Sequence, residues 1–282
     1  MDIFTSKPLS EKNGVKRYTT SDFYWGISPR EEIEKFNILG REKGYLAAKD
    51  EFKFSGRVDY AENYRRADFH FLLPIKKDAI ILDVGSGFGN ITIPLAKHHT
   101  HVVAVDGSLP LLEYSRVRAE SEGLSNIDYI QVDPLENINL PFKPKSFDAI
   151  ILNGVLEWVG PARTDKSPRD LQLEFLKQLR SLLKDDGILY IGIENRMFPG
   201  WLGRDPHSKL KGTTIMPRFL ANMYAKRKGQ KDYRTYIYSS IGYIKLLRQS
   251  GFPLTKFYYP YTTYREPHYI YSEEKGVRTF IL

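Results

Sequence analysis

A short apolar run that leads into three closely spaced glycines constrains this chain more than any other feature. The run is Ala79 to Val84 (AIILDV), followed by Gly85-Ser-Gly-Phe-Gly89 and then by a predicted helix over 90–97. An apolar run of this length that stops at glycines is typical of a buried parallel strand. Glycines allow a tight turn and let a ligand approach the backbone. The helix that follows offers free N–H groups in its first turn.

The alternation of strand and helix continues beyond this turn. Further strands are predicted at 101–106, 127–133, 147–153 and 188–194, and helices at 109–122 and 168–183, the second with Ser167 as its N-cap and Asp186-Gly187 at its end. Five strands interleaved with helices indicate a parallel, doubly wound α/β sheet. A helix at 239–250 and a strand at 254–264 are predicted after it.

Two segments interrupt the alternation. Residues 1–75 are polar, aromatic and irregular, with helices predicted at 31–39 and 59–73. Residues 196–237 hold a predicted helix at 217–226, and a stretch this long is usually functional. We therefore expect an N-terminal extension, or helical cap, at 1–75 and a main domain at 76–282 with a lid-like insertion at 196–237.

Charge and composition narrow the partners and the chemistry. The 282 residues include 42 Lys and Arg against 34 Asp and Glu, which gives a net charge of +8. Nucleic acid, an anionic membrane or an acidic small molecule all suit such a chain. The sequence has no cysteine, which excludes disulfides, thiolate metal sites and cysteine nucleophiles, and we predict no metal site. No apolar leader and no run near the roughly 18–20 residues of a membrane span are present, so we expect a cytoplasmic protein.

Polar residues follow three of the predicted strands. Asp106 ends the second, Asp133 the third and Asn153 the fourth. The carboxyl ends of parallel strands are where open α/β sheets bind ligands. A carboxylate after the second strand suits a ribose, because it can accept hydrogen bonds from both hydroxyls. Any one of these residues alone could be a helix cap, but the ordered set is harder to explain in that way.

This pattern resembles the class I methyltransferases that use S-adenosylmethionine, over about residues 75–195 and more loosely over 239–264. The resemblance implies a Rossmann-like, doubly wound, mostly parallel seven-stranded sheet with the N-terminal extension and an insertion after the fifth strand. It also implies a cofactor site made of Asp83, Gly85, Ser86, Gly87, Gly89, Asp106, Gly107, Asp133, Pro134, Asn153 and Gly154.

The resemblance also assigns roles within this set. The glycine turn would line the methionine and ribose, and Asp83 would hold the methionine amino group, directly or through water. Asp106, with Gly107 after it, would bind the ribose hydroxyls. Asp133 would take the adenine amino group with Pro134 beside it, and Asn153 would contact the methionine portion through the backbone.

Other nucleotide cofactors fit the spacing less well. NAD-binding folds commonly carry Gly-x-Gly-x-x-Gly, whereas the glycines here are two residues apart and Asn90 stands where the third would fall. A phosphate-binding P-loop needs Gly-Lys-Ser or Gly-Lys-Thr, and neither follows these glycines.

The later part of the chain bears on the acceptor. The runs Ile193-Glu-Asn-Arg196, Asp205-Pro-His207 and Met216-Pro-Arg218 resemble methyltransferases of bacterial saccharide modification. An oxygen acceptor has to lose a proton, so we expect His207 as general base and Glu194 as a group that orients substrate. Pro206 stands where such relatives often have Asp, which leaves the role of His207 open.

We therefore expect O-methylation of a small molecule, anionic or sugar-containing, with RNA methylation as the rival activity. Basic residues Arg218, Lys226, Arg227, Lys228 and Lys231 interleave with Tyr224, Tyr233 and Tyr236, which suits RNA, a phosphorylated small molecule or a solvated helix. The Asn/Asp-Pro-Pro-Tyr/Phe motif of many base-amine methyltransferases is absent after the fourth strand, which reads Asn153-Gly-Val-Leu. A non-catalytic partner protein of the same fold is the third alternative, and the sequence leaves the oligomeric state open.

Overall fold

The computed structural model describes residues 2–21, 23–56, 58, 62–133, 139–198, 205, 209–230 and 232–272. They divide into two compact units. The first unit consists of the described residues of Met1–Leu152, Ser181–Tyr190 and Pro260–Ile270. The second unit consists of those of Asn153–Arg180, Ile191–Tyr259 and Tyr271–Leu282.

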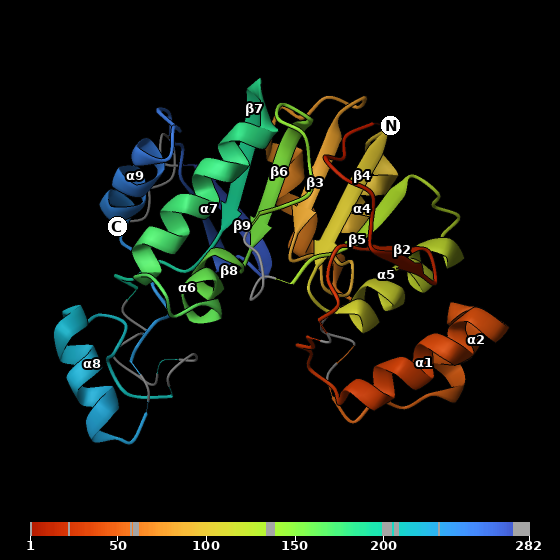
Figure 1. Ribbon diagram of the computed structural model, residues 1–282, viewed down its shortest axis with the longest axis horizontal. Coiled ribbons are helices and arrows are strands. Elements are labelled where there is room, and N and C mark those ends of the chain that lie inside the picture. The colour runs from red at the N-terminus through yellow and green to blue at the C-terminus, as the bar shows by residue number, and fades with distance from the viewer. Residues whose placement is uncertain are drawn as a thin grey trace. The chain divides into compact units, whose positions relative to one another are not determined.

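Seven strands form one mostly parallel sheet in the order β1-β2-β5-β4-β3-β6-β7 (Figure 1). Their bounds are β1 Ser10–Lys12, β2 Val15–Arg17, β3 Ile80–Val84, β4 His101–Asp106, β5 Ile127–Gln131, β6 Phe147–Asn153 and β7 Leu183–Gly192. The central strand β3 pairs in parallel with β4 on one side and β6 on the other. Strand β5 pairs in parallel with β4 and β2, and only β1 is shown to run antiparallel to its neighbour among the described pairings. The predicted α/β class and mostly parallel seven-stranded sheet are confirmed.

The helices fall mainly between these strands. They are α1 Arg30–Lys43, α2 Tyr45–Glu51, α4 Thr92–His98, α5 Leu109–Ser121, α6 Val159–Ala162, α7 Pro168–Leu182, α8 Arg218–Arg227 and α9 Ser240–Gln249. Two short 3-10 helices are η1 Tyr64–Leu72 and η2 Leu156–Trp158. Ser239 caps α9, because its hydroxyl accepts a hydrogen bond from the Gly242 N–H.

The core of the first unit forms around β3. Ile81 of β3 is fully buried with Leu95 of α4, Val102 of β4 and Ile151 of β6. Apolar side chains on successive residues can all be buried here because a parallel strand is covered on both faces. Burial on both faces explains why the run before the glycines, Ala79 to Val84, is almost continuously apolar.

The N-terminal helices pack on α5 within the first unit (Figure 1). Phe36 of α1 and Tyr114 of α5 are fully buried, with ring centroids 5.0 Å apart. The side-chain amide of Asn37 donates to the carbonyl oxygen of Pro110 at 2.8 Å. The aromatic residues of the N-terminal segment therefore build a core with α5, the helix that follows β4.

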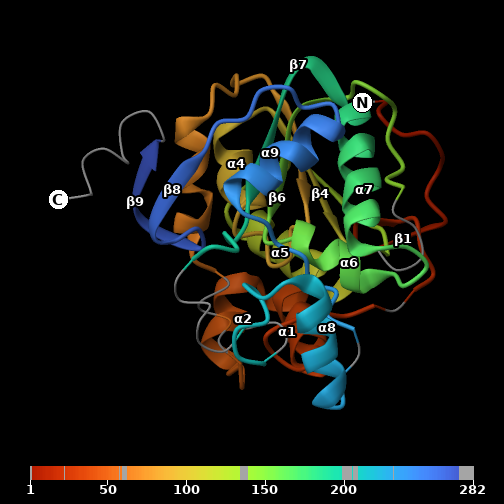
Figure 2. The same cartoon turned by 90° about the vertical axis from the view of Figure 1, so that its left-hand side faces the viewer.

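Several expected elements differ in the structure. Residues 64–72 form the 3-10 helix η1, and Leu183 already begins β7, so Asp186-Gly187 lies inside a strand and does not end a helix. The strand expected at 254–264 is β8 Tyr258–Thr263, which pairs with β9 Glu266–Ser272 in a separate two-stranded sheet (Figure 2). The N-terminal segment, read as irregular, supplies β1 and β2 to the large sheet.

Candidate functional site

The glycine turn after β3 has a backbone that favours glycine. Gly85, Gly87 and Gly89 have φ values of 74°, 51° and 79°, in the left-handed region that other residues enter at a cost. The Gly85 and Ser86 N–H groups both donate to the carbonyl oxygen of Val105, at 2.8 and 3.0 Å. The turn is therefore fastened to the end of β4, next to Asp106.

Glycine can be required in this turn for its positive φ or for lack of space for a Cβ, and a pair of alanine substitutions separates these two reasons. A Cβ at Gly87 would meet no atom within 4 Å, whereas a Cβ at Gly89 would overlap the hydroxyl of Ser115. We expect Gly87→Ala to lower the free energy of unfolding by about 1 kcal/mol, from backbone strain alone. Gly89→Ala should cost about 2 kcal/mol, because overlap adds to strain. Urea unfolding without cofactor measures both, and equal losses would contradict the close approach of α5 to the turn.

Asp106 joins the end of β4 to the glycine turn. One carboxylate oxygen accepts from the Gly87 N–H at 2.9 Å and the other from the Ser108 N–H at 2.8 Å. Loss of hydration raises the pKa of Asp106, and these backbone hydrogen bonds oppose the rise. An ionised carboxylate has about four lone-pair sites. The Gly107 N–H also donates to this carboxylate, so at least one site remains on the half-buried side chain for a ligand donor.

Asp83 is the buried acid of the site. It is the last residue but one of β3 with 1% of its surface exposed, and it accepts a hydrogen bond from the Thr92 hydroxyl at 2.6 Å. Burial raises its pKa from 3.8 to about 6, while Thr92 and the charge of Arg66 act in the opposite direction. The negative charge of Asp106 adds a smaller upward push. A buried carboxyl with so high a pKa would gain from a cationic ligand group.

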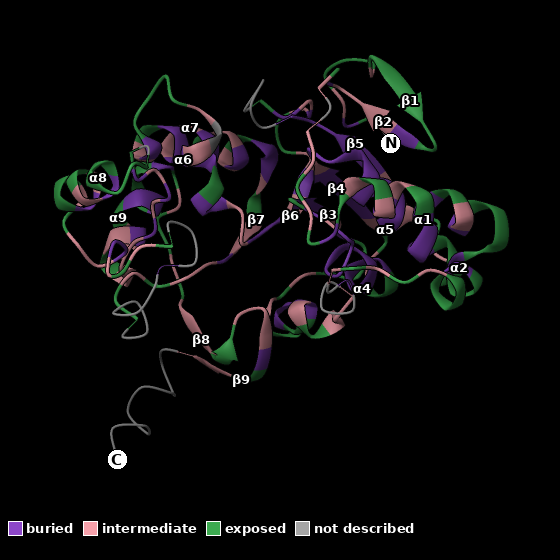
Figure 3. Ribbon diagram, turned by 90° about the horizontal axis from the view of Figure 1, so that it is seen from below, coloured by how far each residue is buried: buried purple, intermediate pink, exposed green. Residues whose placement is uncertain are grey.

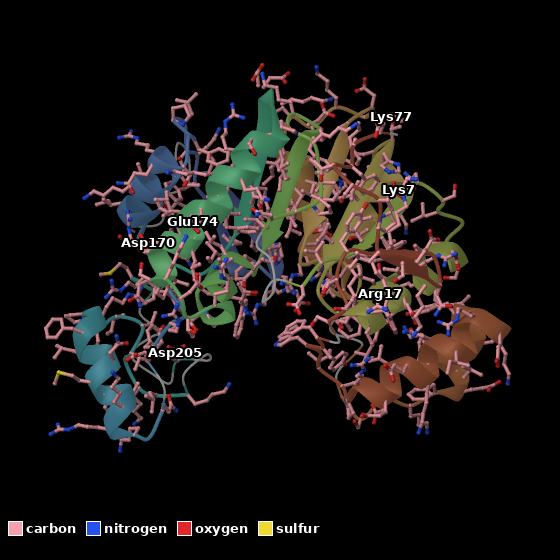
Figure 4. All side chains as sticks on the ribbon, viewed as in Figure 1. Lys7, Arg17, Lys77, Asp170, Glu174 and Asp205 are labelled. Atoms are coloured by element: carbon pink, nitrogen blue, oxygen red, sulfur yellow. The ribbon has the colours of Figure 1, made fainter. Side chains whose placement is uncertain are left out.

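The third acid, Asp133, lies just beyond β5 and is 3% exposed. Gln131, two residues earlier, pairs with Asp106 across the strands, so both acids lie at the same edge of the sheet. The Gln131 amide donates to the carbonyl oxygen of Gly107 at 3.0 Å, and its oxygen accepts from Arg17 of β2 at 2.6 Å. Arg17 is labelled in Figure 4. The N-terminal extension thus supports the backbone next to Asp106.

The chemistry of these groups fits S-adenosylmethionine. The Ser86 hydroxyl is buried in the glycine turn and has no hydrogen-bond partner among the described residues. Buried polar atoms are normally paired, so this hydroxyl suits a polar ligand group. Asp83, Asp106 and Asp133 would offer carboxylate oxygens to the ammonium group, the ribose diol and the adenine amino group of this cofactor. Among the described residues no cluster of three metal-ligating side chains occurs.

The remaining predicted site residues belong to the second unit or are outside the described residues. Asn153 and Gly154 belong to the second unit, where the Gly154 N–H donates to the Gly192 carbonyl oxygen at 2.7 Å. Glu194 follows β7, and its backbone carbonyl accepts from the Tyr243 hydroxyl at 3.0 Å. Pro134 and His207 lie outside the described residues. The structure therefore brings together Asp83, the glycine turn, Asp106, Gly107 and Asp133 in the first unit.

Sequence reasoning missed the residues that support this site. The Thr92 hydroxyl donates to Asp83 and the Ser108 N–H donates to Asp106. Gln131 donates to the Gly107 carbonyl oxygen, and Arg17 in turn donates to Gln131. Thr92 offered a signal, since it lies in the first turn of the helix after the glycines. Arg17 offered none, because only the pairing of β2 with β5 brings it to Gln131.

Comparison with known proteins agrees with this site. Residues 82–191 match the family model described as a methyltransferase domain. The chain is 32% identical over 126 residues to the 23S rRNA (uracil(1939)-C(5))-methyltransferase RlmD of Xylella fastidiosa, which covers 44% of this chain and 24% of that protein. It is 30% identical over 148 residues to the ubiquinone biosynthesis O-methyltransferase of Histophilus somni, which covers 50% of this chain and 58% of that enzyme.

Among solved structures, phosphoethanolamine N-methyltransferase 1 of Haemonchus contortus, in complex with phosphoethanolamine and S-adenosylhomocysteine, is 22% identical. The match covers 81% of this chain and 41% of that one, with a TM-score of 0.47. The chain spans about a quarter of the length of the rRNA methyltransferase that it matches.

Residues 82–191 match a methyltransferase domain, and the sheet has the Rossmann-like fold of the class I, S-adenosylmethionine-dependent methyltransferases. This match implies S-adenosylmethionine as the cofactor of the domain. No helix within the described ranges is both long and apolar enough to cross a membrane.

Proposed function

We propose that this chain transfers the methyl group of S-adenosylmethionine to an oxygen atom of a small molecule. The cofactor part of the proposal rests on Asp106, whose half-buried carboxylate is fixed by Gly87 and Ser108 and can still accept a hydrogen bond from a ribose hydroxyl. When bound, the cofactor supplies an activated methyl group on a sulfonium. The chain has to hold the acceptor in line with that methyl, which is a proximity effect.

One observation in the second unit favours a small molecule over RNA. The guanidinium of Arg218 lies 4.3 Å from the ring centroid of Tyr236 and 5.6 Å from that of Tyr233, and Tyr233 is only 5% exposed. A single-stranded RNA site needs exposed aromatic rings on which bases stack. Two of the three tyrosines in the basic cluster are thus engaged by Arg218 inside the unit.

Sequence chemistry supports the same choice. Methylation of a pyrimidine carbon through a covalent adduct calls for a strong nucleophile such as a cysteine thiolate, and the 282 residues contain no cysteine. The O-methyltransferase relative is matched over 58% of its length, against 24% for the rRNA methyltransferase. The first fact argues against methylation of a pyrimidine carbon, and the second favours an oxygen acceptor.

The acceptor side of the proposal concerns the second unit. Two residue roles stay predictions: His207 as general base and Glu194 as the group that orients substrate. The lid-like insertion at 196–237, the N-terminal cap at 1–75 and a cytoplasmic location also stay predictions. Asp205, labelled in Figure 4, is fully buried and accepts from the Thr213 hydroxyl at 2.9 Å. This hydrogen bond joins two points of the insertion, Asp205 and Thr213, ahead of α8.

Transfer of a labelled methyl group tests the acceptor class. The chain is incubated with S-adenosylmethionine labelled on the methyl carbon, together with either total RNA or a low-molecular-weight cell extract. We expect label in the extract, on a product that resists mild acid and base as an ether does. Asp106→Ala serves as the inactive control. Label transferred to RNA at a comparable rate would contradict the proposal.

A further inference from the structure

Helix α8 exposes large apolar side chains. Phe219, Leu220 and Met223 are 66%, 39% and 55% exposed, while Ala221 and Ala225 on the opposite side are buried (Figure 3). Phe219 and Met223 are four residues apart and therefore lie on one face of the helix. Exposed apolar side chains that gather on one helix face commonly mark a contact surface.

The buried side of α8 is fixed to the second unit. The Arg218 guanidinium donates to the carbonyl oxygen of Ile237, and the side-chain oxygen of Asn222 accepts from the Tyr233 N–H at 2.9 Å. Since the two alanines also face inward, the orientation of α8 is determined by contacts within its own unit. These contacts hold α8 with Phe219 and Met223 on its exposed side.

The exposed face continues into positive charge. Lys226, Arg227 and Lys228 are exposed, and Arg227 follows Met223 by four residues on the same face. Lys226 pairs with Asp232 at 3.0 Å. No acidic residue occurs in the sequence from Arg218 to Lys231, so the helix and the turn after it are purely basic. Apolar residues bordered by lysine and arginine are the pattern of a helix that lies in the surface of an anionic membrane.

We propose that α8 docks this protein onto an anionic lipid surface, with Phe219, Leu220 and Met223 entering the headgroup region and Arg227 and Lys228 contacting lipid phosphates. RNA would use the two cations but would leave the apolar side chains in water. The proposal rests on the side chains of α8 alone and makes no assumption about the identity of the methyl acceptor. It concerns attachment to the membrane surface and no membrane span.

Vesicle flotation of the full chain tests this docking. Vesicles of phosphatidylcholine alone are compared with vesicles that contain equal parts of phosphatidylcholine and phosphatidylglycerol. We expect at least about tenfold stronger binding to the anionic vesicles, and a loss of about tenfold each for Phe219→Ser with Met223→Ser and for Arg227→Glu with Lys228→Glu. Leu254→Ser, at an apolar residue that is 91% exposed in the same unit, is the matched control and should bind as the wild type does.

Three outcomes would overturn the proposal. The first is no binding to anionic vesicles, and the second is undiminished binding by the Phe219→Ser, Met223→Ser variant. The third is a dimer in sedimentation velocity that this variant dissociates, which would assign the face to self-association. If the protein bound RNA through Arg227 and Lys228 but did not bind anionic vesicles, the proposal would likewise be overturned. Unchanged affinity for S-adenosylhomocysteine in every variant shows that the fold and the cofactor site are intact.

Discussion

Asp106→Ala should lower the affinity for S-adenosylhomocysteine by about 100-fold. The substitution removes acceptors for two ribose hydroxyls, and hydrogen bonds to a charged group contribute about 1.5–3 kcal/mol each. It also releases the Gly87 N–H, which the carboxylate holds at 2.9 Å in the turn that faces the ligand. Calorimetric titration of the two proteins measures the ratio of dissociation constants.

Two further variants make this result specific. Asp106→Asn keeps one acceptor oxygen and should fall between the wild type and Asp106→Ala. Asp185→Asn changes an aspartate of the same unit whose side chain is 79% exposed, and it should bind as the wild type does. A folded Asp106→Ala variant with wild-type affinity would remove Asp106 from the cofactor site.

Asp83→Asn should stabilise the fold while it weakens cofactor binding. A rise in the pKa of Asp83 from 3.8 to about 6 corresponds to roughly 3 kcal/mol of lost stability at neutral pH, since one pKa unit is about 1.4 kcal/mol. Asparagine keeps an oxygen that can accept from the Thr92 hydroxyl and carries no charge to bury. We expect a gain of about 1–3 kcal/mol in the free energy of unfolding near pH 7.5, and at least about tenfold weaker binding of S-adenosylhomocysteine.

The pH dependence of this gain has a defined sign. The folded state binds a proton at Asp83 more tightly than the unfolded chain does, so this contribution to stability is complete below about pH 4 and is lost as the pH rises through about 6. The wild type and Asp83→Asn should therefore converge in stability below about pH 4 and differ most above about pH 6.5. Urea unfolding at these pH values measures the difference.

Asp128→Asn is the matched control, because it should lower the free energy of unfolding near neutral pH where Asp83→Asn should raise it. Asp128 lies on β5 and contacts Lys16 at 2.7 Å and His101 at 2.9 Å, and the hydrogen bond from His101 and the neighbouring lysine lower its pKa to about 2. Its charge stabilises the fold above the unfolded pKa, and this contribution is lost as the pH falls toward about 2. The variant should lose about 1–2 kcal/mol near pH 7. If Asp83→Asn also lost stability there, burial would not be the source of the raised pKa.

The strands around the glycine turn could be predicted because a strand buried on both faces appears in the sequence as a continuous apolar run. His101–Asp106 and Phe147–Asn153 have the predicted bounds. Each is a parallel strand covered on both faces, so nearly every residue is apolar and the run ends where a polar residue closes the strand. Asp83 and Asp106 stood out for the same reason, as acids placed directly after such runs or within them.

Elements defined by pairing alone could not be predicted. Val15-Lys-Arg17 has one apolar residue, Val15, which is fully buried, and its register with β5 is a tertiary contact. Asp185-Asp186-Gly187 is typical of a helix end, yet it lies within β7 at the end of the described strand order, where polar residues are tolerated. Burial of Tyr233 beneath Arg218 was equally invisible, since composition cannot show which ring of a basic, tyrosine-rich segment faces inward.

A crystal structure of the chain with S-adenosylhomocysteine tests the central claim most directly. We predict that both ribose hydroxyls lie within hydrogen-bond distance of the Asp106 carboxylate, with the homocysteine portion against Gly85–Gly89 and its amino group near Asp83. Ligand density at another place on the sheet, or a ribose held by a different acid, would contradict the assignment of this site. A chain that binds no S-adenosylhomocysteine in calorimetry would instead be a non-catalytic protein of the same fold.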